Sequence, residues 1–158
     1  MKMEEITIKQ RTVRKSQNSI SWETTVRILE QQLDGVLGVV SLDGYPYCVP
    51  MNYVFAENKI IMHSAREGYK LNCLAKNPQV SFTAYNVLEV KPTTSNWECA
   101  MIFGRAQVVS DVVLKNKYMR MLAGKFGDIQ PEPFPPELLK LFEVILIDIE
   151  EFSGKIKA

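Results

Sequence analysis

Two prolines inside an otherwise strand-like run restrict the possible folds of this chain more than any other feature. Residues 45–56 follow Asp43 and Gly44, a pair typical of a two-residue hairpin turn, and contain Pro46 and Pro50. Because proline has no N–H to donate to a sheet ladder, such a strand lies at an edge, carries a bulge, or separates from the sheet where a ligand receives its remaining backbone groups. We expect one of these three arrangements.

The rest of the chain alternates strand patterns with amphipathic stretches. Ser21 and Asp111 are N-cap residues followed by apolar side chains at helical spacing, and a shorter helix is expected before Pro78. Residues 87–97 are expected to form a loop. This order of elements predicts an α+β fold whose antiparallel sheet closes toward a barrel, with flanking helices. The predicted strands are 36–42, 45–56, 59–64, 80–85, 98–109 and 142–152.

Length and charge limit the organisation and the partners. At 158 residues the chain is long enough for one core and short for two, so we expect a single domain over 1–158, with residues 1–19 as an N-terminal arm. The formal net charge of +1 provides no field that would hold a polyanion, which argues against a general nucleic-acid binder.

Cysteine usage and hydropathy limit the metal chemistry and the compartment. Three cysteines without CxxC spacing and a single histidine, His63, do not form the usual zinc ligand sets, so no metal site is expected. No segment approaches the roughly 20 apolar residues that span a bilayer. We therefore expect reduced thiols, no membrane association and a cytoplasmic protein.

A second motif follows the third predicted strand, in the sequence IIMHSAREGYKLNCLAKNP over residues 60–78. It joins a strand to a helix, and a helix N-terminus with free N–H groups receives a phosphate well. Ser64 could donate its hydroxyl, while Arg66 and Lys70 could neutralise the anion. Alternatively, Ser64 and Glu67 form a capping box and the basic residues are a solvated face. Spacing alone leaves both interpretations open.

Taken together, DGYPYCVPMNYVF over residues 43–55 and the motif at 60–78 resemble the flavin-binding split-barrel family related to pyridoxamine phosphate oxidase. The resemblance is strongest to its nitroimidazole-resistance (Nim)-like branch. AMIFGRAQVV over 100–109 and IDIEEFSGK over 147–155 are also similar to that branch. The resemblance covers most of the chain from about Ser21 onward.

The resemblance implies a homodimer in which each barrel binds one FMN in a groove between subunits, with no nucleic-acid or membrane partner. It also implies a role for individual residues of this sequence. The implied cofactor-binding residues are Val49, Pro50, Met51 and Asn52 along the ring and ribityl chain, His63, Ser64 and Ala65 on the strand that leads to the phosphate, Lys70 at the phosphate, and Cys99 near the ring.

The matching histidine in Nim-like proteins lies near the flavin, so His63 is the candidate catalytic residue, as proton donor or as ring contact only. Cys99 departs from the hydrogen-bonding residue that relatives often carry at its position. The chain ends FSGKIKA without a further histidine, which argues against oxidation of vitamin B6.

These observations predict an FMN-binding oxidoreductase that reduces a small electron-poor, nitroaromatic-like substrate, with the flavin carrying the chemistry. The alternative is a noncatalytic split-barrel protein that binds FMN or haem as a store or sensor.

Overall fold

The computed structural model describes residues 7–128 and 132–158. No helix within those ranges is long and apolar enough to cross a membrane. The helices are η1 (Ser16–Asn18), α1 (Trp22–Gln31), α2 (Tyr69–Lys76), α3 (Val112–Lys125) and α4 (Pro136–Leu139), and the strands are β1 (Lys9–Gln10), β2 (Asp34–Val40), β3 (Pro46–Asn52), β4 (Val54–Ala56), β5 (Lys59–Ala65), β6 (Gln79–Lys91), β7 (Thr94–Val109) and β8 (Phe142–Lys157).

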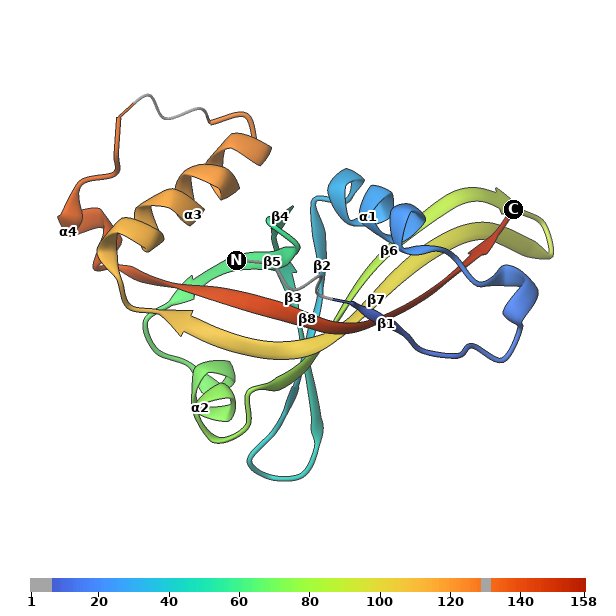
Figure 1. Cartoon of the computed structure of the whole chain (residues 1–158), viewed down its shortest axis with the longest axis horizontal. Helices are drawn as coiled ribbons and strands as arrows, with labels where there is room; N and C mark the ends of the chain where they lie inside the picture. The colour runs from blue at the N-terminus through green and yellow to red at the C-terminus, as the bar shows by residue number, and fades with distance from the viewer. Residues whose placement is uncertain (1–6, 129–131) are drawn as a thin grey trace.

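The described strands form one sheet in the order β3-β2-β6-β7-β8-β5-β4, with β1 added in parallel to β8. β3 and β4 are the two ends of this order, yet only Tyr53 separates them along the chain. A single bent strand therefore pairs with β2 through its first part and with β5 through its second, which closes the sheet into a barrel (Figure 1). The predicted α+β fold, a split barrel with flanking helices, is confirmed.

The two prolines lie where the ladder does not need them. β3 pairs with β2 alone, so it is an edge strand. Tyr53 N donates to Leu33 O at 3.4 Å, which sets the alternation of the ladder: odd-numbered residues of β3 direct their backbone groups toward β2. Pro46 and Pro50 have the other parity, so their nitrogens face away from β2 and no ladder bond is lost.

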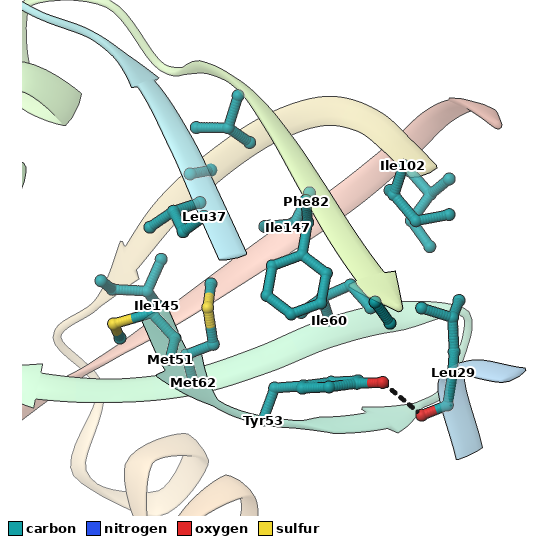
Figure 2. Packing of buried hydrophobic residues seen from close by; sticks show 14 of the residues in the cluster. Leu29, Leu37, Met51, Tyr53, Ile60, Met62, Phe82, Ile102, Ile145 and Ile147 are labelled. Atoms are coloured by element: carbon teal, nitrogen blue, oxygen red, sulfur yellow. Dashed lines mark hydrogen bonds between the residues drawn. The ribbon is translucent and has the colours of Figure 1, made fainter. Parts of the chain in front are cut away.

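Tyr53 is fully buried at the bend and belongs to the barrel core (Figure 2). Its ring packs edge-on against Phe82 with the centroids 4.7 Å apart. Its hydroxyl donates to Leu29 O at 2.7 Å, in the last turn of α1, where carbonyls have no helical partner. Burial raises the pKa of the hydroxyl, which keeps it a donor. Aliphatic side chains fill the rest of the core, among them Leu37, Met51, Ile60, Met62, Ile102, Ile145 and Ile147.

α1 is held in the position that this hydrogen bond requires. Ser21 accepts from Thr24 N at 3.2 Å, so the predicted N-cap is confirmed. At the other side of the helix, Arg27 binds Glu98 of β7 at 2.6 Å, and the Glu98 side chain is only 2% exposed. Hydrogen bonding from Arg27 holds the pKa of that carboxyl below its usual value, against the effect of burial.

α3 covers the outer face of β5 and β8, opposite the barrel core. It begins at the predicted cap, Asp111, which accepts from Leu114 N at 2.8 Å. In Figure 1, α3 lies above the β5–β8 ladder and α2 lies below it. The apolar cluster under α3 is made by Ile61, Val109, Tyr118, Leu122, Val144 and Leu146.

The prediction of a loop over residues 87–97 is wrong. β6 and β7 continue through this range as a hairpin that closes with the pair Lys91 and Thr94. The register shifts between Val87 and Glu89, so Leu88 is an extra residue. This bulge interrupts the period-2 pattern by which the strand could have been recognised. The N-terminal arm also contacts its own chain, since Arg11 lies 3.6 Å from the Phe103 ring centroid.

Replacing Tyr53 by phenylalanine tests how much the bend depends on its hydroxyl. Tyr53→Phe keeps the ring but leaves the Leu29 carbonyl without that donor, so the free energy of unfolding should fall by about 1 to 2 kcal/mol. Tyr45→Phe is the matched control, because Tyr45 is 77% exposed. Urea unfolding followed by circular dichroism gives both values, and equal stability of the two variants would contradict this role for Tyr53.

Candidate functional site

The barrel opens where the bent strand changes its partner. β4 pairs with β5 through Val54 and Ile61, and the same register continued by two residues would place Asn52 opposite His63. Beyond Tyr53, however, β3 pairs with β2 and not with β5. We call the opening between β3 and β5, which begins at Asn52 and His63, the split.

One wall of the split is the free edge of β3. Even-numbered residues of β3 direct their backbone groups away from β2. The free groups are the N–H groups of Cys48 and Asn52 and the carbonyls of Cys48, Pro50 and Asn52. Cys48, Pro50 and Asn52 are all exposed. Of the three arrangements that the two prolines predicted, the structure shows the edge strand. An edge with both donors and acceptors can fix the orientation of a planar heterocycle.

A cavity of about 310 Å³ lies where the split begins, a volume at the lower end of the range of ligand sites in proteins. Asn52 and His63 line it from the barrel side. Its other wall is apolar and comes from α3, while Asp128 and Phe134 complete the lining. The residues that form this wall are Met119, Leu122 and Ala123 of α3 and Phe126, the C-cap residue of the helix.

Directly after His63 on β5, but on the opposite face of the strand, a buried hydroxyl has no partner among the described residues. The Ser64 side chain is 5% exposed, and its Oγ forms no hydrogen bond within the described residues. Buried polar groups are nearly always paired, so an unpaired one needs an explanation. The capping-box interpretation of Ser64 and Glu67 is wrong, because α2 begins at Tyr69 and its N-cap, Gly68, makes no side-chain bond.

The N-terminus of α2 therefore stays open. Leu71 N and Asn72 N both bond to Gly68 O, and none of the described backbone carbonyls accepts from the N–H groups of Tyr69 or Lys70. Gly68 has φ 147° with open space around it, a conformation that L side chains rarely adopt. Backbone N–H groups at such a terminus favour an anion.

The two basic residues of this motif behave differently. Arg66 lies 3.7 Å from Glu143, which also binds Lys115 at 2.8 Å. Lys70 is half-buried in the first turn of α2, and no described residue forms an ion pair with it. Lys70 is therefore the cation that remains available at the open end of α2.

The structure brings several of the expected cofactor residues together and separates others. Pro50, Asn52, His63 and Ala65 are exposed at the two walls of the split. The side chains of Val49 and Met51 pack with the core instead. Because the side chains of Val49 and Met51 face the barrel interior, they would contact a cofactor only from that side of the strand.

Cys99 lies far from the split within one chain. It is on β7, opposite Tyr85 and Lys155, on the same outer sheet face as Pro50. β7 is three strands from β3, which corresponds to about 14 Å at the usual strand spacing. Cys99 reaches a ligand in the split only if that ligand, or a second chain, extends across the sheet.

The contribution of α3 could not be found from the sequence. Its apolar side chains have the spacing of an ordinary amphipathic helix, and no local signal indicates that Met119, Ala123 and Phe126 would lie across from His63. That arrangement depends on where α3 packs on β5 and β8.

Several solved structures share this fold. A candidate 5-nitroimidazole antibiotic resistance protein from Bacteroides thetaiotaomicron has TM-score 0.79 and 22% identity, over 87% of this chain and 86% of that chain. An FAD-binding protein from Mesorhizobium loti has TM-score 0.69 and 22% identity, over 89% and 97%. An FAD and haem binding protein from Mycobacterium smegmatis has TM-score 0.74 and 17% identity, over 87% and 71%.

The comparison with curated proteins found no match. The family model described as pyridoxamine 5'-phosphate oxidase matches residues 21–156, which include the bent strand, the split and α2. The resemblance seen in the sequence is thereby confirmed: the chain belongs to the pyridoxamine 5'-phosphate oxidase family.

Proposed function

We propose that this protein is an FMN-dependent oxidoreductase that reduces a small electron-poor substrate of the nitroaromatic kind. The observation that carries the proposal is the unpaired, buried Ser64 hydroxyl on the strand that leads to the uncapped N-terminus of α2. An anionic group is the ligand that these donors suit. The free edge of β3 lies across the same opening, where a planar ring fits.

Each part of FMN has chemically suitable residues in the split. Ser64 Oγ, the N–H groups of Tyr69 and Lys70, and the Lys70 ammonium would hold the phosphate. The backbone groups of Pro50 and Asn52 would fix the polar edge of the ring. In these assignments Ser64 gains the partner that it lacks among the described protein atoms.

When bound, FMN supplies the electron or hydride transfer. The protein's own contribution is to orient the substrate and to move a proton. His63 is exposed beside Asn52, and its imidazole N–H can donate a proton to a substrate oxygen that becomes negatively charged. The apolar wall from α3 limits water at that position.

The homodimer is part of the proposal. The outer sheet face of β2, β3 and β6 exposes apolar side chains, among them Val36 at 40% and Tyr85 at 53%. Exposed apolar surface of this kind favours association. A second chain on this face would also bring a copy of Cys99 toward the split, where it would approach a ring that one chain alone cannot place near it.

The names of the similar structures support a flavin. Two of the proteins that share this fold are described as binding FAD, and a third as a candidate 5-nitroimidazole resistance protein. We favour FMN over FAD because Ser64 Oγ and the first turn of α2, with Lys70, are the donors of one phosphate site.

Lys70→Ala tests the phosphate site. The variant should lose FMN affinity by about 1.5 to 3 kcal/mol, roughly 10- to 150-fold, but should bind riboflavin almost as the wild type does, because riboflavin has no phosphate. Quenching of flavin fluorescence on titration gives both dissociation constants. Lys76→Ala, on the last turn of the same helix, removes an equal charge and should change neither.

Two results would count against the proposal at different levels. Equal losses of FMN and riboflavin affinity in Lys70→Ala would refute the role of Lys70. A wild-type protein that binds neither FMN nor riboflavin would refute the flavin proposal as a whole.

A noncatalytic FMN- or haem-binding protein is the second candidate, supported by the similar protein that is described as binding both FAD and haem. His63 distinguishes the candidates. For an enzyme, His63→Gln should keep FMN affinity within about twofold and lower the reduction of nitrobenzene by NADH or NADPH at least 100-fold. For a haem protein, added haem should give a Soret band that His63→Gln abolishes. Bound FMN without turnover of either donor in the wild type would favour a store or sensor.

A further inference from the structure

The cavity against α3 has a composition that neither the strand edge nor the phosphate site explains. Four of its apolar lining residues come from α3 and its C-cap: Met119, Leu122 and Ala123 from the helix, and Phe126 as the cap. Such a wall offers no hydrogen bond to a ribityl chain or a phosphate. Thioether and aromatic side chains do pack well against the face or edge of a ring.

The apolar wall is preformed, because α3 is attached at both ends. Near its start, Lys115 Nζ donates to Phe142 O at 2.9 Å and pairs with Glu143 at 2.8 Å. At its end, Lys125 donates to Gln32 O, beyond the end of α1. Between these attachments, Leu122 is 3% exposed and belongs to the apolar cluster on β5 and β8.

The polar groups of the cavity lie on one side. Asn52 and His63 face the α3 wall from the barrel and can both donate hydrogen bonds. Asp128 is the one charged residue among those that line the cavity within the described ranges, and it carries a carboxylate. A neutral ring with a hydrogen-bond-accepting substituent is complementary to this lining, whereas a charged ring would be desolvated against the apolar wall.

We propose that the α3 cavity is the substrate pocket: it binds a neutral, planar ring compound, with Asn52 and His63 at the polar substituent. Ala123, Met119 and Phe126 set the size of ring that the pocket accepts. That the bound ring is a substrate rests on the proposed function, but the capacity to bind such a ring does not. The pocket also disfavours phosphorylated and carboxylated rings, because the apolar wall would remove water from their charge without replacing it.

Nitrobenzene is the probe, and its dissociation constant is measured by ligand-observed NMR with the full chain. Ala123→Leu adds bulk to the apolar wall and should weaken nitrobenzene binding about tenfold or more. Gly124→Leu is the matched control, since a Cβ added at the neighbouring position meets nothing within 4 Å. It should bind nitrobenzene within twofold of the wild type. The anionic 4-nitrobenzoate should bind the wild type at least tenfold more weakly than nitrobenzene.

A second variant protects the test against misfolding of the first. Met119→Ala enlarges the pocket and should bind the larger 1-nitronaphthalene at least fivefold more tightly than the wild type does. The proposal is overturned if Ala123→Leu binds nitrobenzene within twofold of the wild type, or if 4-nitrobenzoate binds as tightly as nitrobenzene.

FMN titration of the same variants separates this proposal from the proposed function. FMN affinity should stay within twofold of the wild type in both α3 variants. If no variant binds FMN but Ala123→Leu still loses nitrobenzene, the ring pocket stands and the proposed function fails. If FMN binds and the α3 substitutions leave nitrobenzene affinity unchanged, the pocket proposal is refuted and the proposed function stands.

Discussion

The change of pairing partner at Tyr53 is the constraint on which the rest of the structure depends. One continuous strand pairs with β2 before this residue and with β5 after it. The bend in this strand closes the barrel and leaves an opening beside it. The buried hydrogen bond from Tyr53 to Leu29 fixes the bend to α1. A strand that continued along β5 instead would cover the edge where Asn52 now lies opposite His63.

The sides of the opening toward α2 and toward α3 differ in chemistry, and this difference decides which part of a ligand each side suits. Toward α2 it has a buried hydroxyl, an open helix N-terminus and a lysine, which suit an anion. Toward α3 it has an apolar wall with two polar side chains opposite, which suits a ring. In our proposals the phosphate of FMN lies at the α2 end, the FMN ring lies along the free edge of β3, and the substrate ring packs against α3.

The sequence predicted the features that follow from covalent chemistry and local bonding. Because proline lacks a donor, Pro46 and Pro50 limited their strand to an edge, a bulge or a separated segment, and the structure shows the edge. Ser21 and Asp111 were found as caps because their side chains act within three residues. The β6–β7 hairpin was missed because the bulge at Leu88 disrupts the alternation. For α2, the sequence left an open N-terminus and a capping box as alternatives, and the structure shows the open N-terminus with Gly68 as N-cap. The position of Ala123 in the same cavity as His63 depends on tertiary packing, so no local pattern encodes it.

Amide hydrogen exchange with and without FMN tests the free edge of the bent strand most directly. The account predicts that FMN slows exchange at the Asn52 and Lys70 amides by about tenfold or more, because both lack a backbone partner in the split. The amides of Val49 and Met51, which already face β2, should change little. FMN that binds while leaving the Asn52 and Lys70 amides unprotected would contradict the account.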